Sequence, residues 1–271
     1  MSDQPTFIQQ TREVSGCKVA LKRGGTGPKL LYLHGAGGGA VVHPFMQELA
    51  KDHEVIAPEH PGFGSSDEPA WLDNIHDLAY FYLDFLEALD LRDVTVFGAS
   101  IGGWLAMEIA VRDCSRLRAL SLAGPSGIHV QGLRKGDLFM WTPEERLRNL
   151  YHDQAIAERL IAMTPSPEQV DAMMKDAFTV ARLAWEPRLY DPHLYKWLHR
   201  IRKPVQILWG EHDRILPSGY AAELQKLIPG SQMHIVKDCG HLPQVEKPQE
   251  FLKLFRGFEA YVEASHVSKK G

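Results

Sequence analysis

Residues 93–113 read DVTVFGASIGGWLAMEIAVRD and join a strand pattern directly to a helix pattern. The apolar and β-branched residues before Ser100 predict a buried strand, and those after it predict a helix, with only a tight turn between. The pattern G-x-S-x-G, formed by Gly98, Ser100 and Gly102, therefore lies at a strand-to-helix junction. A serine in so sharp a turn adopts a strained backbone that projects its hydroxyl, and the flanking glycines let strand and helix approach closely. Ser100 is a candidate nucleophile.

The same alternation of strand and helix continues through most of the chain. Such alternation predicts a mostly parallel sheet flanked by helices, and we expect eight strands. Between residues 125 and 198 only helical patterns are found, with capping-box starts at Thr142 and Ser166. Seven strand patterns can be located, at 17–23, 29–34, 53–60, 93–100, 117–124, 204–213 and 232–238, and the helical patterns between and after them lie at 43–51, 73–90, 101–113, 219–228 and 248–264.

Composition excludes several classes of protein. The chain has 271 residues, of which 44% are hydrophobic and 24% charged, with a formal net charge of −4. It has no long basic run, so no nucleic-acid partner is predicted. No apolar stretch is long enough to span a membrane, and no membrane association is expected. Three widely spaced cysteines favour a reducing compartment, so the predicted location is the cytoplasm.

A serine hydroxyl needs a base to take its proton and a third group to orient that base. After a G-x-S-x-G turn, the expected chain order is Ser, then Asp or Glu, then His. Asp213 follows a predicted strand in WGEHDRILP, and His241 follows the last predicted strand in DCGHLPQ. Both lie where open α/β sheets place their sites. We predict a triad of Ser100, Asp213 and His241, with Glu211 as a competing acid in the same loop.

The glycine-rich stretch HGAGGGA, residues 34–40, has two possible functions. It fits the turn that binds a dinucleotide pyrophosphate, with Glu59 in place to bind a ribose. It also fits the turn that donates backbone N–H groups to an oxyanion. The next helix starts near His43, too late for these glycines to seat a pyrophosphate on its N-terminus. The oxyanion function is favoured, and no cofactor is expected.

A metal-dependent hydrolase is not favoured either. HEVIAPEH, residues 53–60, has Ala57 where the H-E-x-x-H zinc motif needs its second histidine, and the segment has a strand pattern. His34 and His60 flank the predicted site, and we expect both to make structural hydrogen bonds. No metal is predicted.

Five segments together resemble the landmarks of the α/β-hydrolase superfamily, in order and over nearly the whole chain. They are HGAGGG at 34–39, HPGFGSSD at 60–67, GASIGG at 98–103, WGEHDRILP at 209–217 and GHLPQVEKP at 240–248. The resemblance implies an oxyanion hole formed by the backbone N–H groups of Ala36 and Ile101. It also implies a hydrolase core of residues 1–124 and 200–271, with residues 125–199 as a helical cap domain over the pocket.

The type of hydrolase is a narrower question. Ser100 argues against dehalogenases and epoxide hydrolases of this superfamily, which carry Asp as the nucleophile. Carbon–carbon bond hydrolases of aromatic degradation usually have a Pro in the glycine loop and a Trp after the catalytic His, where this chain has Gly and Leu242. Hydrolysis of a carboxylic ester or lactone through an acyl-enzyme is therefore the first expectation. The carbon–carbon hydrolase and a ligand receptor with little turnover stay as alternatives.

The cap is expected to select the small-molecule substrate, which we expect to be moderately hydrophobic. Among its apolar side chains, Trp141 and Trp185 are the predicted pocket residues. Arg182 and Arg188 could instead meet a substrate carboxylate, which would favour the carbon–carbon hydrolase.

Overall fold

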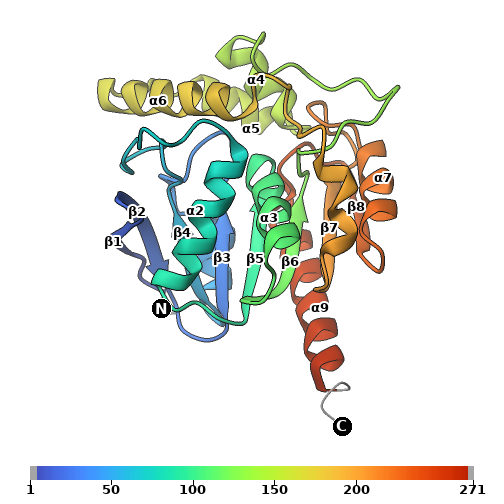
Figure 1. Cartoon of the computed structure of the whole chain (residues 1–271). Coiled ribbons are helices and arrows are strands. Elements are labelled where there is room, and N and C mark those ends of the chain that lie inside the picture. Colours follow the sequence, from blue (N-terminus) through green and yellow to red (C-terminus); the bar gives the residue numbers. More distant parts are fainter. Residues whose placement is uncertain (1–4, 268–271) are drawn as a thin grey trace.

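The computed structural model describes residues 5–267. Within this range one sheet contains eight strands in the spatial order β1-β2-β4-β3-β5-β6-β7-β8 (Figure 1). The strands pair in parallel from β4 through β8, whereas β1–β2 and β2–β4 are antiparallel. This confirms the predicted, mostly parallel sheet. The strands are β1 (Ile8–Val14), β2 (Cys17–Gly24), β3 (Lys29–Leu33), β4 (Glu54–Pro58), β5 (Val94–Ala99), β6 (Leu117–Ala123), β7 (Val205–Gly210) and β8 (Gln232–Val236).

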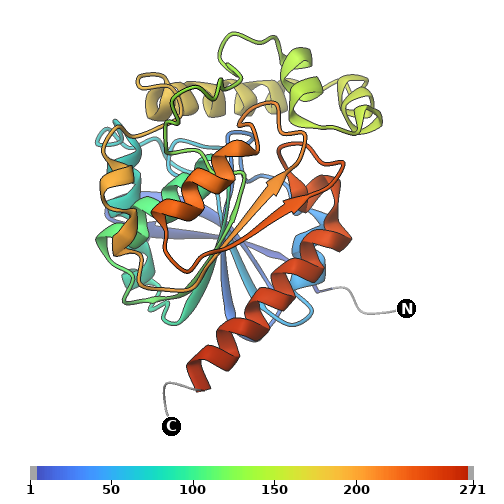
Figure 2. The same ribbon diagram turned by 90° about the vertical axis from the view of Figure 1, so that its right-hand side faces the viewer.

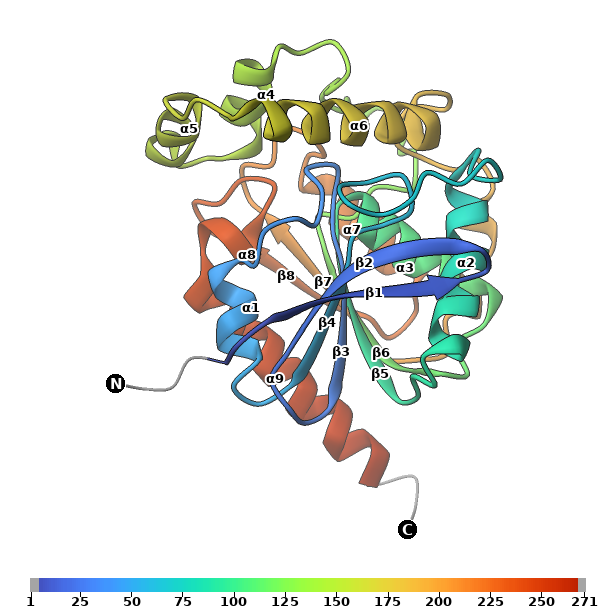
Figure 3. The ribbon, with the colours of Figure 1, turned by 90° about the vertical axis from the view of Figure 1, so that its left-hand side faces the viewer.

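Helices cover both faces of the sheet. On one face lie α1 (Pro44–Leu49) and α9 (Pro248–Val267), and on the other lie α2 (Ile75–Ala88), α3 (Ile101–Arg112) and α7 (Gly219–Leu227) (Figure 3). Each face buries its own apolar cluster, with Phe45 and Phe251 against one side of β5 and Trp104 and Tyr82 on the other side of the sheet. Because β5 is central and buried along its whole length, the residue that follows it is held rigidly.

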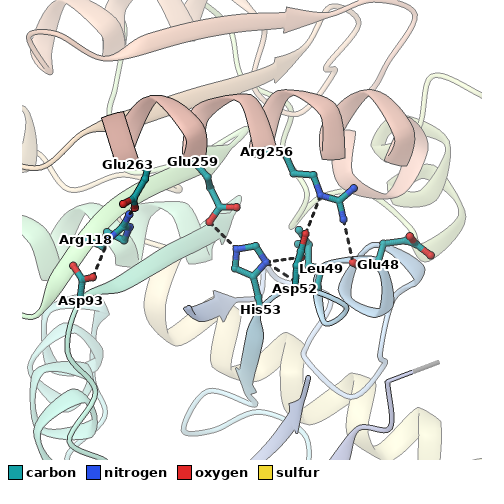
Figure 4. Close-up of polar contacts among 9 residues, drawn as sticks. All are labelled: Glu48, Leu49, Asp52, His53, Asp93, Arg118, Arg256, Glu259 and Glu263. Atoms are coloured by element: carbon teal, nitrogen blue, oxygen red, sulfur yellow. Dashed lines mark hydrogen bonds and ion pairs between the residues drawn. The ribbon is translucent and has the colours of Figure 1, made fainter. Parts of the chain in front are cut away.

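Polar contacts also attach α9 to residues at or just before the start of β4 and β6 (Figure 4). The His53 ring contacts the Glu259 carboxylate at 2.8 Å, and the Arg118 guanidinium pairs with Glu263. These contacts join residues far apart in the chain and hold the last helix against the core.

The segment between β6 and β7 is a helical insertion, as predicted. It contains α4 (Pro143–Leu150), α5 (Gln154–Ile161) and α6 (Pro167–Ala184), followed by two short 3-10 helices, η1 (Leu194–Lys196) and η2 (Leu198–Arg200). The helices α4 to α6 form a layer over the carboxyl ends of the parallel strands (Figures 1 and 2). Both predicted capping boxes are present, at Thr142 and Ser166. The insertion therefore lies where open α/β sheets bind ligands.

Helix α6 is attached to the loop that follows β4. Asp176 accepts a hydrogen bond from the Gly64 N–H at 2.9 Å, and the Lys175 ammonium donates to the carbonyls of Gly64 and Ser66 at 2.9 and 2.6 Å. The buried Thr179 hydroxyl donates to the Gly62 carbonyl at 2.6 Å. No helix among residues 5–267 is both long and apolar enough to cross a membrane.

Candidate active site

Ser100 lies in the sharp turn between β5 and α3 and has a strained backbone. Its φ and ψ are 55° and −117°, a combination that a side-chain-bearing residue adopts only under constraint. Its N–H donates to the Ala123 carbonyl at 2.9 Å, and its carbonyl accepts from the N–H groups of Gly103 and Trp104. Strand β6 and helix α3 therefore hold this backbone conformation. Ser100 also lies at the N-terminus of α3, where the helix dipole favours negative charge.

Two glycines make this turn possible because there is no room for a side chain beside it. A Cβ on Gly102 would lie 2.0 Å from the Leu33 carbonyl oxygen, and one on Gly98 would lie 2.4 Å from the Gly102 carbonyl oxygen. The residues at both positions must therefore be glycine for β3, β5 and α3 to approach as they do.

His241 and Asp213 are brought together by the loops after β8 and β7. The His241 Nδ1 atom and the Asp213 Oδ2 atom are 2.6 Å apart, and the two side chains are 2% and 0% exposed. The other carboxylate oxygen of Asp213 accepts from the N–H groups of Ile215 and Leu216, both at 2.9 Å. The carboxylate is thus fixed on one side by backbone and on the other by the imidazole, which orients the ring.

Ser100 and His241 both lie beside the end of β6. Ser100 is hydrogen-bonded to Ala123, and a Cβ on the next residue, Gly124, would lie 3.2 Å from His241 Nδ1. The His241 Nε2 atom is buried and has no hydrogen-bond partner among the described residues. The imidazole therefore presents one bonded nitrogen to Asp213 and one unpaired nitrogen to the interior of the site. Glu211, the competing acid, instead contacts Lys237 at 2.6 Å near the surface.

The glycine-rich loop packs directly against the serine. A Cβ on Gly35 would lie 3.2 Å from the Ser100 Cβ, and the loop is closed by a hydrogen bond of 3.2 Å from Gly38 N–H to the Gly35 carbonyl. Among the described residues, no backbone hydrogen bond uses the N–H of Ala36 or Ile101. The two groups named by the resemblance as oxyanion donors are thus both unengaged beside Ser100.

The dinucleotide interpretation of this loop is not supported, because its acid is occupied. Glu59 is buried, pairs with the Lys22 ammonium at 2.9 Å and accepts the Ser65 N–H at 2.6 Å. Helix α1 begins only at Pro44 and has six residues. Segment 53–60 contains strand β4, so it does not present a helical zinc motif.

His34 and His60 form a buried stacked pair below the glycine loop, in the structural role expected of them. Their ring centroids are 3.7 Å apart. His34 Nδ1 donates to the Gly35 carbonyl at 2.8 Å, and its Nε2 accepts the His60 N–H at 3.0 Å. The Tyr82 hydroxyl donates to His60 Nδ1 at 2.6 Å. Burial lowers the pKa of His34 to about 4, so its ring is neutral at pH 7.

A cavity of about 300 Å³ lies between the glycine loop and the insertion. Its lining includes neither Ser100 nor His241, which are 7% and 2% exposed, but it does include Ala36 and Gly37 of the glycine loop that packs against Ser100. Trp141, one of the two predicted pocket residues, lines it. Trp185 does not line it and packs edge-on against a residue that does, with ring centroids 5.2 Å apart. The lining consists of Ala36, Gly37, Leu138, Phe139, Trp141, Arg146, Met173, Asp176, Ala177 and Val180.

Arg146 is the cavity residue that sequence reasoning missed. It lies on α4, and its Nε atom is buried without a hydrogen-bond partner among the described residues. The two arginines suggested by the sequence are engaged elsewhere and do not line the cavity. Arg182 pairs with Glu68 at 2.5 Å, and Arg188 pairs with Asp137 and lies over the Trp185 ring. No local pattern distinguishes Arg146 from its neighbours, because the cavity is created by tertiary packing.

The sequence also did not predict a second feature, in which residues 150–153 of the insertion pack against residues 240–246. We call these two segments the seam. The His241 N–H donates to the Leu150 carbonyl at 2.8 Å. The Glu246 carboxylate, 9% exposed, accepts from the N–H groups of Gly240 at 2.8 Å, His152 at 3.2 Å and Asp153 at 2.6 Å. Glu246 ends the short helix α8 (Pro243–Glu246). The insertion is thereby hydrogen-bonded to the loop that carries His241.

A serine at a strained strand-to-helix turn, beside a buried His–Asp pair and under a helical insertion, is the arrangement of a hydrolase built on a parallel sheet. A model of the alpha/beta hydrolase family matches residues 30–254, and the chain belongs to this family.

Among curated proteins, the chain is 28% identical to 2-hydroxymuconate semialdehyde hydrolase of Pseudomonas sp. strain CF600, over 94% of each chain. It is 29% identical to 2-hydroxy-6-oxo-2,4-heptadienoate hydrolase of Pseudomonas putida, over 90% of this chain and 94% of that protein. A solved meta-cleavage product hydrolase from Pseudomonas fluorescens IP01 shares the fold, with a TM-score of 0.78 and 22% identity over 94% of this chain and 98% of that one.

Proposed function

We propose that this hydrolase cleaves a carbon–carbon bond beside a ketone in a substrate that carries a carboxylate. The observation that carries the proposal is Arg146, which lines the cavity together with Ala36 and whose buried Nε atom has no hydrogen-bond partner among the described residues. A buried donor without a partner is costly, and a carboxylate is the ligand that its planar fork binds best. The sequence favoured an ester or lactone, and Arg146 together with the relatives moves the preference to the alternative.

The charge balance of the cavity agrees with an anionic substrate. Asp176 also lines the cavity, but its carboxylate is bonded to the Gly64 N–H. Burial raises the pKa of Asp176, with a further contribution from Glu59, whereas the Gly64 hydrogen bond lowers it. Arg146 is the cationic side chain among the described residues that line this cavity.

The names of the relatives support a carbon–carbon bond as the bond that is cleaved. A 2-hydroxy-6-oxo-2,4-heptadienoate has a carboxylate, an enol and a ketone but no ester or amide, so its hydrolysis must break a carbon–carbon bond. Two curated relatives are named for substrates of this dienoate or semialdehyde kind. A carboxylate at one end would pair with Arg146 while the ketone lies against the glycine loop.

In the proposed reaction, His241 takes the proton of Ser100 through its unpaired Nε2 atom as the serine oxygen attacks the ketone carbon. The N–H groups of Ala36 and Ile101 stabilise the oxyanion, worth about 3–4 kcal/mol for one donor. The carbon–carbon bond then breaks, its electron pair goes to the carboxylate-bearing fragment, and His241 returns the proton to that carbon. Water releases the acyl group from Ser100 by the same route.

The second candidate is hydrolysis of a carboxylic ester or lactone by the same residues. Leu242 favours it, because carbon–carbon hydrolases of aromatic degradation usually carry Trp after the catalytic His. An ester needs no carboxylate receptor, so this candidate leaves Arg146 without a role.

The two candidates are separated by comparing 2-hydroxy-6-oxo-2,4-heptadienoate with p-nitrophenyl butyrate on the parent chain and on Arg146→Ala. We expect kcat/KM for the dienoate to fall about 10- to 100-fold in the variant, because a hydrogen bond to a charged group is lost, while the neutral ester changes little. Arg148→Ala is the matched control, since Arg148 lies on the same helix and pairs with Glu144 at 2.9 Å outside the cavity.

Turnover of the ester alone would contradict the proposal and establish the ester hydrolase. Equal losses on both substrates would remove Arg146 as the carboxylate receptor. No turnover of either substrate, with binding retained, would favour the receptor alternative.

A further inference from the structure

Two histidines and an aspartate gather at the outer side of the seam. His152 lies between α4 and α5, His212 follows β7, and Asp238 follows β8. One ligand atom from each residue lies within 4.8 Å of the other two. His212 immediately precedes Asp213 in the chain, so the cluster lies beside the buried His–Asp pair without belonging to it.

We propose that His152, His212 and Asp238 form a zinc site that joins the helical insertion to the loops that carry Asp213 and His241. Two imidazoles and one carboxylate are a donor set that suits Zn²⁺, with a fourth position left for water. An unpartnered atom supports this assignment, because His152 Nδ1 is buried and has no hydrogen bond among the described residues.

The distances call for a small contraction on binding. Ligand atoms around a tetrahedral zinc ion lie about 3.4 Å apart, given bonds of about 2.0–2.1 Å. His212 Nε2 and Asp238 Oδ1 are 4.0 Å apart. The His152 and His212 rings are stacked, with centroids 4.1 Å apart and planes at 20°, so one ring must turn to point its lone pair at a shared ion. The side chains of His212 and Asp238 are 43% and 75% exposed and are free to make this adjustment.

Neighbouring charges are compatible with a cation. Glu211 Oε2 lies 3.6 Å from His212 Nε2, and the Lys237 ammonium contacts the other Glu211 oxygen at 2.6 Å. The positive charge of Lys237 is thus balanced by the negative charge of Glu211, and the carboxylate of Asp238 leaves the cluster with a net negative charge.

A second histidine–carboxylate cluster among the described residues differs from the cluster at the seam, because a side chain already supplies its positive charge. His76, Glu108 and Asp191 also come close together, but Arg112 lies among them, contacting Glu108 at 2.5 Å and His76 Nδ1 at 2.8 Å. A guanidinium already occupies the position of the cation there. The cluster at the seam has no arginine among its contacts in the described part of the chain, which is why we assign the metal to it.

Binding would have a mechanical consequence. His152 is in the insertion and adjoins the hydrogen bonds of Glu246 to residues 152 and 153, whereas the other two ligands belong to the core. One ion therefore links the insertion to the core at the place where the insertion already contacts the His241 loop. This inference does not depend on which bond the enzyme hydrolyses.

The test uses the full chain after treatment with EDTA and dialysis. Calorimetric titration with zinc chloride is expected to show one ion per chain, and saturating zinc is expected to raise Tm by at least about 3 °C. Hydrogen exchange of residues 150–153 should slow in the same samples. Magnesium, which prefers six oxygen ligands, should give no shift.

Variants locate the ion. His212→Ala and Asp238→Asn should each lose the Tm shift, whereas His199→Ala, at an exposed histidine outside the cluster, should keep it. Asp238 is largely exposed, so Asp238→Asn tests the site even if His212→Ala folds poorly. The proposal is overturned if zinc leaves Tm of the parent unchanged, or if Asp238→Asn binds zinc as the parent does.

Discussion

The buried ring of His34 connects the core to the loop that contacts Ser100. Its two nitrogens have different partners, since Nδ1 donates to Gly35 and Nε2 accepts from the His60 N–H. Only the neutral ring can fill both roles, because a protonated imidazole has no acceptor. The protonation state of His34 is therefore part of the structure that positions the Ala36 N–H.

Acid should destabilise the protein through this ring. The pKa of His34 is lowered to about 4 in the fold and returns to about 6.5 on unfolding, so between these pH values the unfolded chain binds the extra proton. The free energy of unfolding should therefore fall as pH drops from 6.5 towards 4, by up to about 3 kcal/mol from His34. Urea unfolding at a series of pH values measures this.

The matched comparison is His34→Gln, which keeps a donor and an acceptor but does not titrate. Its stability should be lower at pH 7.5, with a shallower decline towards pH 4, while the exposed-site variant His199→Ala should follow the parent. A decline as steep in His34→Gln as in the parent would show that His34 is not the titrating group.

At the scale of elements, two of the places where the insertion is hydrogen-bonded to the core lie far apart in the chain. Helix α6 is held by the loop after β4, and the turn between α4 and α5 is held by Glu246. The second attachment matters more for chemistry, because Glu246 also bonds the N–H of Gly240, the residue before His241. Glu246 is thus a positioning residue that links the placement of the insertion to that of the imidazole.

Replacing Glu246 by Gln should loosen this link. An amide has one oxygen where the carboxylate has two, so at least one of the three backbone donors loses its acceptor. We expect kcat to fall about 10-fold, with a smaller change in KM and faster hydrogen exchange confined to residues 150–153 and 240–241. Glu250→Gln, which changes an exposed carboxylate in the first turn of α9, is the control.

Unchanged kcat in Glu246→Gln, with Tm also unchanged, would show that the seam does not position His241. A general loss of exchange protection across the whole sheet would instead assign Glu246 a purely structural role.

The same elements show what the sequence could predict. Helix α2, with its strong apolar stripe, helix α3, which is buried along nearly its whole length, and the buried strands lie within a few residues of their predicted bounds, because local pattern and burial agree there. Strand β1 belongs to the eight strands expected, but the sequence does not locate it, since most of its residues are exposed and its strand conformation comes from pairing with β2. Helix α8 has only four residues, too few to show a helical period.

Some residues of the candidate site could also be predicted from the sequence, and others could not. Ser100, Asp213 and His241 could be predicted because each follows a strand within a local motif. Arg146 and Glu246 could not, because Arg146 shares a cavity with Ala36 and Glu246 accepts a hydrogen bond from His152, each about 90 or more positions away. The preference for an ester also came from local positions, Leu242 among them, which carry no information about the cavity above the serine.

At the scale of the whole molecule, the parallel sheet brings three distant segments to one edge and the insertion covers them. Ser100 and His241 are almost fully buried beneath it, and the division into a core domain and a cap domain remains a prediction. All the proposed chemistry depends on one claim, that Ser100 is a nucleophile activated by the His241–Asp213 pair.

Labelling with a fluorophosphonate, read by intact-protein mass and peptide mapping, tests that claim most directly. We expect one adduct per chain, on Ser100, and none in Ser100→Ala. The adduct should be retained in Ser126→Ala, because Ser126 is a buried serine whose N–H donates to the Ser100 carbonyl at 3.2 Å. An unlabelled parent chain, or an adduct that persists in Ser100→Ala, would contradict it.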